Sequence, residues 1–597
     1  MSEPVIRKYT CDVLCIGGSG AAVSAAHMAS AAGKSVILMS KGKAGRSGNA
    51  IMVGGGFGID GYSSRHVLGE LEADETYTPD RLMERIVKYS FYLSDQRLAR
   101  QFVTDAAPMV KVFLRWAKAA GQTMLFSPKG GLYAVSGNCI GRTIAQGIKE
   151  IPGLMTFSDV MAVDLVKDGD RVAGVIGLDI YKGEYIHVEA GATILATGGY
   201  QPYTLKNTIS EITGDGMGMA LRAGAKVADM EFLLYIPTAV EPEFLRGSII
   251  PYLFTIPIFM PLSFRVVDGS GGELPLRPPF DKVPGSNKAM KLIYSSFWSL
   301  GTDADVMRGG LYYDYSDHTD EEIIRAFDHF LAHYGHWHPK GKYNGYDMIA
   351  LRDELLRTKR LQFALGNEYS NGGVVVDETM SSGVPGLYAA GETASGVFGA
   401  FRAGDGLAEM LAHGYRAGIS AAEYVERAGM PGSTDLAARQ VVNEVEAVLK
   451  RQGSCRSETL LREINRCADE GFGVIRNEAG LEKAALALDG IARKLDRVGI
   501  PDQDRRYNLD LCHYLEARNL LLCVTAGVMA ARERRESRGT HVRSDYSAVD
   551  QAFLCRICLQ LDGGRLVTSR IRPDLSELPP PGRNYSDIHA YLAEIMA

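Results

Sequence analysis

Long hydrophobic runs and a strong charge of either sign are missing from this 597-residue sequence. The net charge of −6 gives no indication of nucleic-acid binding. No apolar run approaches the roughly 20 residues that a membrane-spanning helix needs. The N-terminal segment MSEPVIRKYT lacks the apolar core of a secretory signal. We therefore predict no direct membrane insertion and a cytoplasmic location.

Cysteine patterns that hold cofactors or metals are also missing. The nine cysteines show no paired framework, no CxxCH haem site and no four-cysteine iron–sulfur run. Cys555 and Cys558 lie in an expected strand, where residues three apart face opposite sides, so we interpret them as structural thiols. A histidine-rich stretch from His318 to His338 lacks carboxylate or cysteine partners at fixed spacing, and we predict no metal site there.

The order of apolar patterns predicts an α/β fold. Residues 12–40 read as a buried strand (VLCI), a tight turn, a small-residue helix and a second strand (SVILMS), which is the opening βαβ unit of a doubly wound sheet. Helical periodicity follows over residues 78–122, and residues 155–197 alternate around turns as an antiparallel meander does. The hydrophobic and charged fractions, 46% and 23%, fit a globular protein of several domains.

Shifts in composition predict the domain boundaries. Residues 236–365 are rich in proline and aromatic side chains with weak periodicity, which indicates an inserted capping domain, whereas residues 435–536 are strongly helical. We therefore expect a nucleotide-binding domain in two parts (1–235 and 366–425), a capping domain (236–365), a helical domain (430–546) and a C-terminal tail (547–597).

A glycine-rich turn follows the first expected strand. It reads Gly17-Gly18-Ser19-Gly20-Ala21-Ala22, with Ser19 and Ala22 in place of two of the usual glycines of a dinucleotide fingerprint. Such a turn lets a pyrophosphate approach the N-terminus of the next helix. The acidic residue usual at the end of the second strand is replaced by Ser40-Lys41.

Further motifs follow in a fixed order. They are Arg46-Ser47-Gly48-Asn49, Ala196-Thr197-Gly198, Thr213-Gly214-Asp215-Gly216, Ala389-Ala390-Gly391-Glu392, Arg402, Gly406-Leu407, and ESRGTHVRSDY at residues 536–546. In these motifs and in Ser40-Lys41 the chain resembles the flavoprotein subunits of succinate dehydrogenase and fumarate reductase. L-aspartate oxidase and the alpha subunit of adenylylsulfate reductase belong to the same superfamily. The resemblance covers nearly the whole chain.

The resemblance implies an α/β fold with a Rossmann-like FAD-binding domain, an inserted α+β capping domain and a C-terminal helical domain. The residues that it assigns to FAD are Gly17, Gly18, Ser19, Gly20, Ala21, Ser40, Lys41, Gly45, Arg46, Ser47, Gly48, Asn49, Gly54, Gly55, Ala196, Thr197, Gly198, Asp215, Glu392, Gly406 and Leu407. Gly48 stands where succinate dehydrogenases carry the histidine that links covalently to the flavin, so we predict non-covalent, dissociable FAD.

The resemblance is weaker at the substrate site. The family holds its dicarboxylate with two histidines and an arginine, and a second arginine donates the proton. Arg402 matches the first arginine, but Ile236 and Glu368 replace the histidines, and Lys288 or Lys291 is the nearest cation in the donor segment. Arg265 is a candidate replacement cation. Because Ile236 cannot bind a carboxylate and Glu368 would repel one unless protonated, a plain C4 dicarboxylate is disfavoured.

The resemblance, with these departures, implies hydride transfer between FAD and an organic acid or enoate. Arg402 would anchor the substrate, and Glu368 or a capping-domain cation would handle the proton. Electrons would pass to or from an external donor or acceptor, for example a ferredoxin or an iron–sulfur subunit. Three alternatives stay open. One is an adenylylsulfate-reductase-like enzyme with an obligatory ferredoxin, whose family loop RSGAxAQG resembles RSGNAIMVGGG here. The others are an oxidase of the aspartate oxidase kind and a non-enzymatic electron-transfer or scaffold subunit.

Overall fold

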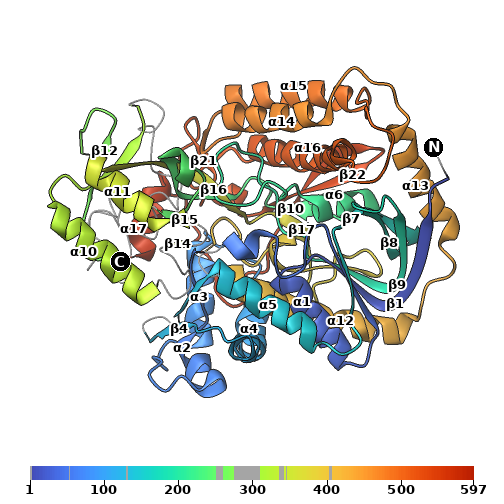
Figure 1. Cartoon of the computed structure of the whole chain (residues 1–597), viewed down its shortest axis with the longest axis horizontal. Helices are drawn as coiled ribbons and strands as arrows, with labels where there is room; N and C mark the ends of the chain where they lie inside the picture. The colour runs from blue at the N-terminus through green and yellow to red at the C-terminus, as the bar shows by residue number, and fades with distance from the viewer. Residues whose placement is uncertain are drawn as a thin grey trace.

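The fold is taken from a computed structural model. It describes residues 3–52, 54–128, 132–250, 260–273, 309–334, 342–343, 346–402 and 406–596. Figure 1 shows the cap elements β12, α10 and α11 at one end of the long axis and the meander β7–β9 at the other. Within the described residues, no helix is both long and apolar enough to cross a membrane.

A seven-stranded sheet forms the centre of the molecule, in the order β6-β2-β1-β9-β8-β7, with β18 also paired to β9. Its strands are β1 (Ile6–Ile16), β2 (Val36–Ser40), β6 (Met155–Ser158), β7 (Val160–Asp168), β8 (Arg171–Asp179), β9 (Tyr185–Leu195) and β18 (Leu387–Ala389). β1 pairs in parallel with β2 and β9, and α1 (Gly20–Ala31) connects β1 to β2, which is the predicted βαβ unit. β7, β8 and β9 form the predicted antiparallel meander.

Helices lie on both sides of this sheet (Figure 1). One side carries α1, α4 (Gln96–Ala119), α5 (Gly137–Glu150) and α12 (Gly406–Ala428). α1 and α12 pack closely because small residues face each other. A Cβ added at Gly414 or Gly418 would lie 2.4 Å from the carbonyl oxygen of Ala21 or Ala25, respectively. This contact brings the N-termini of both helices to the same edge of the sheet.

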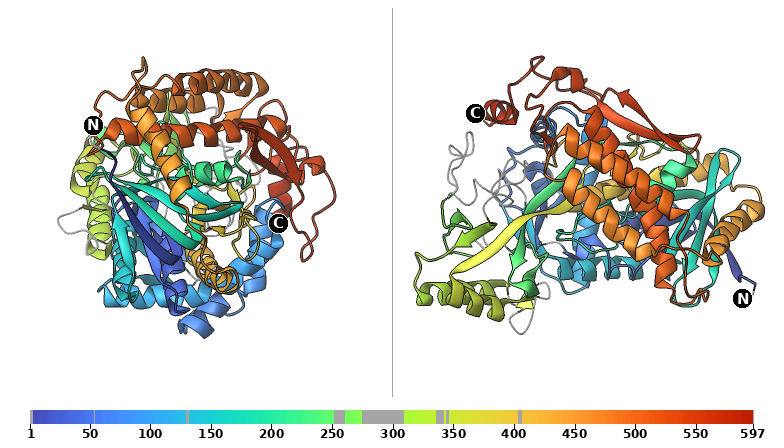
Figure 2. Two further views of the ribbon diagram at one scale, coloured as in Figure 1. Left: turned by 90° about the vertical axis from the view of Figure 1, so that its right-hand side faces the viewer. Right: turned by 90° about the horizontal axis from the view of Figure 1, so that it is seen from above.

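The cap has its own sheet and its own core. Four antiparallel strands are ordered β11-β16-β13-β12, namely β11 (Leu233–Glu241), β12 (Arg265–Asp268), β13 (Leu311–Asp314) and β16 (Arg360–Ser370). With α10 (Asp320–Tyr334) and α11 (Met348–Thr358) they enclose a separate hydrophobic cluster that extends from Ala239 to Phe363. β11 and β16 pair along most of their length, and Figure 2 (right) shows this ribbon running from the main body into the cap.

Helices of the C-terminal part cover the opposite side of the sheet (Figure 1). They are α13 (Asp435–Leu449), α14 (Ser457–Gly471), α15 (Glu478–Leu495) and α16 (Leu509–Glu533). Residues 547–597, expected as a tail, contain β22 (Arg556–Asp562) and β23 (Arg565–Ile571), which complete a five-stranded sheet with β10 (Val227–Ala228), β17 (Gly373–Val375) and β19 (Ala394–Ser395). The end of the chain is therefore built into the main body.

The remaining elements are short or lie at the periphery. They are α2 (Gly61–Ser63), α3 (Pro79–Tyr89), α6 (Asp215–Ala223), α17 (Ile588–Ile595), β3 (Gly54–Gly58), β4 (Leu125–Ser127), β5 (Leu132–Ser136), β14 (Lys342–Tyr343), β15 (Tyr346–Asp347), β20 (Ile475–Arg476) and β21 (Val542–Arg543).

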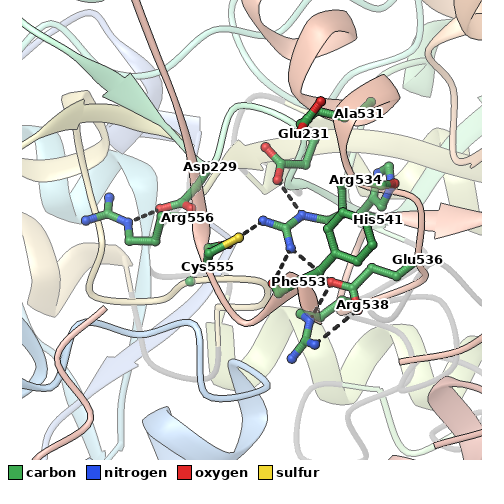
Figure 3. A network of polar contacts seen from close by, with 12 residues as sticks. Asp229, Glu231, Ala531, Arg534, Glu536, Arg538, His541, Phe553, Cys555 and Arg556 are labelled. Atoms are coloured by element: carbon green, nitrogen blue, oxygen red, sulfur yellow. Dashed lines mark hydrogen bonds and ion pairs between the residues drawn. The ribbon is translucent and has the colours of Figure 1, made fainter. Parts of the chain in front are cut away.

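A buried network of ion pairs ties the end of α16 to the segment that precedes β11 (Figure 3). Arg534 Nε lies 2.6 Å from Glu231 Oε1, and Arg534 Nη1 lies 2.9 Å from Glu536 Oε1. Glu536 also binds Arg538 Nε at 2.7 Å. These four side chains are at most 1% exposed, and Arg534 donates further to the backbone carbonyls of Phe553 and Cys555.

Candidate active site

A cavity of about 1120 Å³ lies where β1, β2 and β9 end. Residues from the first 52 positions, from the start of α6, from β11, from residues 368–369 and 390–410, and from α16 all line it. In doubly wound folds ligands bind outside the carboxyl ends of the parallel strands, because the adjacent loops diverge there. The sheet topology therefore places the predicted motifs around one space.

The turn between β1 and α1 allows a ligand to approach the backbone closely. Gly17 has a φ of +135°, and a Cβ there would lie 2.1 Å from the carbonyl oxygen of Ala196. Gly17, Gly18, Ser19 and Ala21 line the cavity. Ser19 is the N-cap of α1, yet its side chain makes no capping hydrogen bond. The first-turn amides thus have no side-chain acceptor from the cap, as suits a phosphate ligand.

Some predicted FAD residues support this turn without lining the cavity. Gly20 packs against α12, and Gly45 donates its N–H to the carbonyl of Gly18 at 2.8 Å. Gly54 and Gly55 lie on β3, paired with β5. The structure brings the other predicted FAD residues to the lining: Ser40, Lys41, Arg46, Ser47, Gly48, Asn49, Ala196, Thr197, Gly198, Asp215, Glu392, Gly406 and Leu407.

Lys41 links three elements at one end of the cavity. Its Nζ lies 2.8 Å from Asp215 Oδ2 on α6 and 2.9 Å from Glu516 Oε1 on α16, and it donates to the Glu211 carbonyl at 2.8 Å. Burial alone would raise the pKa of the Asp215 carboxyl, but the Lys41 charge and the hydrogen bonds hold it below its usual value. Glu516 is a lining residue that the motifs did not indicate.

Glu392 occupies a partly buried position next to the predicted substrate residues. It follows β18 and accepts a hydrogen bond from the Ser370 N–H at 3.0 Å. Burial raises the pKa of Glu392 to about 7, although the Ser370 N–H and the nearby charge of Arg402 act in the opposite direction. The carboxyl can therefore exchange a proton near neutral pH.

Arg402 and Glu368 meet inside the cavity. Arg402 Nη2 donates to Glu368 Oε2 at 2.9 Å, and the Arg402 guanidinium stacks over the ring of Tyr369 with its Cζ 4.5 Å from the ring centroid. The Tyr369 hydroxyl donates to Glu409, which is buried in the first turn of α12. Gln201 donates to the backbone carbonyl of Glu368 at 2.7 Å. The arginine is thus held from two sides.

Apolar side chains line the same cavity as this ion pair. Leu234 and Ile236 on β11 line the cavity with Ile249 and Phe401, and Ile236 is 1% exposed. Ile236, which the resemblance matches to a carboxylate-binding histidine of the family, is one of these side chains. Among the described residues, the cavity therefore combines the paired arginine Arg402 with hydrocarbon surface.

The structure does not bring Arg265 to this cavity. Arg265 lies on β12 in the cap, where it pairs with Asp314 at 3.3 Å and with Asp317 at 3.2 Å, and it is not among the lining residues. Its charge is neutralised by these two aspartates within the cap. Lys288 lies outside the described residues.

Several residues that line the cavity lie outside the sequence motifs. They are Arg85 and Tyr89 on α3, Asn207 and Ile209 in the loop before α6, and Leu509, Cys512 and His513 on α16. Arg85 and Tyr89 are four residues apart, which places them on one face of α3. This spacing was visible in the sequence, but nothing local indicated which face meets the cavity.

The histidine-rich stretch lies in the cap. His318 contacts Glu322 at 3.3 Å and the Ser263 carbonyl at 2.7 Å, and His336 and His338 lie outside the described residues. In the described part of the chain no group of three or more histidine, cysteine, aspartate or glutamate side chains is arranged to hold a metal ion.

The sheet topology, the glycine turn and the cavity together define a dinucleotide-binding α/β protein, and comparison with known proteins specifies the class. The family described as FAD binding domain matches residues 12–255 and 320–407. The family described as Fumarate reductase flavoprotein C-term matches residues 461–585.

Relatives match over most of the chain. A fumarate reductase (CoM/CoB) subunit from Methanothermobacter marburgensis is 27% identical over 565 residues, covering 90% of this chain and 95% of the relative. Two solved structures share the fold. Quinol fumarate reductase of E. coli has a TM-score of 0.78 and 22% identity, covering 96% of this chain and 98% of that one. Adenylylsulfate reductase of Archaeoglobus fulgidus has a TM-score of 0.73 and 16% identity, covering 96% and 97%.

The chain belongs to the superfamily of succinate dehydrogenase and fumarate reductase flavoproteins, and it is an FAD-dependent oxidoreductase. The predicted family and fold class are thereby confirmed.

Proposed function

We propose that this protein transfers hydride between non-covalently bound FAD and a carboxylic acid or enoate that is not a plain C4 dicarboxylate. The observation that carries the proposal is the ion pair between Arg402 and Glu368 in the same cavity as the apolar side chain of Ile236. One arginine suits one substrate carboxylate. The hydrocarbon wall suits an apolar remainder in the place of a second carboxylate.

The described residues fit FAD. The turn at Gly17 and the α1 N-terminus would hold the pyrophosphate, and Gly406 and Leu407 would place amides beside the flavin ring. When bound, FAD supplies a hydride donor or acceptor at its N5 atom. Gly48 has a φ of +88° and lines the cavity, and glycine has no side chain that could form a covalent link. This supports dissociable FAD.

Reduction of a carbon–carbon double bond also requires a proton. Glu368 lines the cavity and contacts the arginine that would hold the substrate carboxylate. Arg265 is engaged by aspartates in the cap, away from the lining. We therefore propose that the carboxyl of Glu368 holds the proton, with a capping-domain cation such as Lys288 as the alternative.

Electrons would reach or leave the flavin through a separate partner. The sequence has no haem or iron–sulfur motif, and several relatives are named as flavoprotein subunits of fumarate reductases. We propose that the donor or acceptor is a ferredoxin or an iron–sulfur subunit. An adenylylsulfate-reductase-like reaction is the second candidate, because Ile236 and Glu368 depart from the fumarate-binding histidines.

An anaerobic half-reaction tests the function. The reduced enzyme is mixed with fumarate or with bulkier enoates such as 2-methylpropenoate and cinnamate, and the return of oxidised flavin absorbance is followed. We expect reoxidation by an enoate with an apolar substituent and none by fumarate. Rapid reoxidation by fumarate contradicts the substrate proposal. If sulfite is the only tested compound that reacts, seen as bleaching of the oxidised enzyme, the sulfur reaction is favoured. If oxygen is the only compound that reoxidises the reduced enzyme, an oxidase is favoured.

Acid precipitation tests how the flavin is held. A glycine at position 48 predicts that all the flavin appears in the supernatant after precipitation. Flavin absorbance that stays with the protein pellet would contradict non-covalent binding.

A further inference from the structure

A buried asparagine belongs to the lining of the cavity. Asn207 is 5% exposed, and its backbone N–H donates to the carbonyl of Asn367 at 3.2 Å, directly before Glu368 on β16. Further along the same loop, the Glu211 carbonyl accepts a hydrogen bond from Lys41 at 2.8 Å, and Glu211 also lines the cavity. The loop therefore passes along the cavity from the Glu368 side to Lys41, with Asn207 on the Glu368 side.

The contacts of the Asn207 side chain determine how its amide is turned. Thr238 on β11 donates its hydroxyl hydrogen to the Ile236 carbonyl at 2.9 Å, so its oxygen can only accept a further hydrogen bond. Asn207 Nδ2 donates that bond at 3.2 Å. The opposite orientation of the amide would bring two acceptors together. Nδ2 therefore faces Thr238, and Oδ1 is the other end of the amide.

The Oδ1 atom of Asn207 is an acceptor without a partner on the cavity surface. Within the described residues no N–H or O–H group donates to it, and protein atoms do not enclose it completely. Because the side chain is otherwise buried and lines the cavity, the accessible part of Oδ1 faces the cavity. A ligand that covers this oxygen without a donor would remove its water and leave it unpaired, which weakens binding.

We propose that Asn207 selects substrates that carry a hydrogen-bond donor, such as a hydroxyl group, in addition to the carboxylate. The inference rests on the proposed function and narrows its substrate class to hydroxyl-bearing acids or enoates. Arg402 binds the carboxylate, the apolar side chains around Ile236 cover the carbon skeleton, and Asn207 Oδ1 accepts the hydrogen bond of the hydroxyl. Asn207 is thus a specificity-determining residue.

The expected discrimination follows from the acceptor that stays unpaired. An ethyl group and a hydroxymethyl group have nearly the same size, so an apolar lining accommodates both and distinguishes them poorly. A site with a buried acceptor instead rejects the analogue that lacks the donor. We therefore expect the hydroxymethyl compound to react about tenfold or more faster than the ethyl compound.

The experiment compares 2-(hydroxymethyl)propenoate with 2-ethylpropenoate on the reduced, FAD-loaded enzyme. Anaerobic stopped flow gives the second-order rate constant of flavin reoxidation for each compound in wild type, Asn207→Leu and Thr238→Val. Leucine has a similar shape but no acceptor, so the ratio of the two rate constants should fall about tenfold or more. Thr238→Val removes the contact that orients the amide and should lower the ratio less. The control Asn443→Leu changes an exposed asparagine on α13 and should keep the wild-type ratio.

Binding of unreactive acids gives a second measure that needs no turnover. The 2-, 3- and 4-hydroxybenzoates and the corresponding methylbenzoates are titrated against the oxidised enzyme by the change in flavin absorbance. In wild type we expect at least one hydroxybenzoate to bind about tenfold more tightly than its methyl counterpart, and we expect no such preference in Asn207→Leu. If Asn207→Leu does not fold, wild type and Thr238→Val decide.

Two results would overturn the inference and leave the proposed function intact. The first is the absence of a preference in wild type, both in the reoxidation rates and in binding. The second is a preference that persists in Asn207→Leu. A changed flavin midpoint potential in Asn207→Leu with an unchanged preference would assign the acceptor to FAD instead. Conversely, an Asn207-dependent preference among the benzoates without reoxidation by any enoate contradicts the proposed reaction alone.

Discussion

At the scale of single residues, Arg402 is the side chain on which the proposed chemistry depends. Its replacement by methionine should slow reoxidation by an enoate about 100-fold or more, because truncating one partner of a hydrogen-bonded charge pair costs about 2–5 kcal/mol. The flavin content should stay unchanged, since Arg402 is proposed to bind the substrate and not FAD. Stopped-flow reoxidation and the flavin-to-protein ratio measure the two effects.

Arg352→Met is the matched control for this substitution, because Arg352 pairs with Asp353 on the cap surface. It should leave the rate unchanged. If Arg402→Met is as active as the control, the protein is better described as an electron-transfer subunit that has lost substrate chemistry.

We expect the stability of the flavin-free protein to depend on pH because of Glu392. Burial raises its pKa from an ordinary value near 4.5 to about 7, so the folded state binds the proton more tightly than the unfolded state. Stability therefore falls as pH rises from about 4.5 to about 7, by up to about 3 kcal/mol, and is constant above this range. Glu392→Gln should match wild type near pH 5 and unfold at a higher temperature at pH 8. Equal melting temperatures at pH 8 would contradict this assignment.

The residues that could be predicted from the sequence are those in contiguous motifs. Gly17, Ser19 and Arg402 sit in local patterns that a cofactor or substrate imposes on neighbouring positions, and the structure brings them to one cavity. Arg85 and Glu516 could not be predicted, because each comes from a helix whose orientation is set by tertiary packing. Arg265 is a case in which the sequence misleads. It was a candidate cation for the substrate site because of its place in the capping segment, but in the structure it pairs with Asp314.

At the scale of elements, Lys41 joins β2, α6 and α16 at one end of the cavity. Lys41→Met would leave Asp215 and Glu516 as adjacent carboxylates without their shared cation. Removing one partner of a buried ion pair costs about 3–5 kcal/mol. We expect a lower melting temperature and weaker FAD retention, measured as flavin released during gel filtration.

Lys182→Met is the control for Lys41→Met, because Lys182 is an exposed lysine paired with Asp179. It should change neither the melting temperature nor the flavin content. Full retention of FAD in Lys41→Met would show that α16 does not contribute to holding the cofactor through this contact.

Regular elements were predicted where hydrophobic periodicity is strong. The βαβ unit, the helices within residues 78–122 and the helical character of residues 435–536 follow directly from it. The strand around Cys558 was predicted and corresponds to β22, but its pairing with β10 could not be predicted, because β10 lies more than 300 positions earlier in the chain and is itself only Val227–Ala228. Short pairings between distant segments leave little local signal in the sequence.

At the scale of the whole molecule, two hydrophobic cores are joined by the β11–β16 ribbon, and the cavity includes residues from both of its strands. Leu234 and Ile236 come from β11, and Glu368 and Tyr369 come from β16. Leu234 and Tyr369 belong to the core of the main body, so the ribbon lines the cavity at the end that lies outside the cap core.

The buried arginine network holds the helical part and the chain end on this framework. Arg534 binds Glu231, Glu536 and two backbone carbonyls with no exposed surface (Figure 3). Arg534→Met should destabilise the protein by about 3–5 kcal/mol, because Glu231 and Glu536 would stay buried without their common cation. Arg583→Met, which removes an exposed pair with Glu594, should cost at most about 1 kcal/mol. Denaturant unfolding of the FAD-loaded enzyme measures both, and equal midpoints for the two variants would show that the network does not stabilise the assembly of the domains.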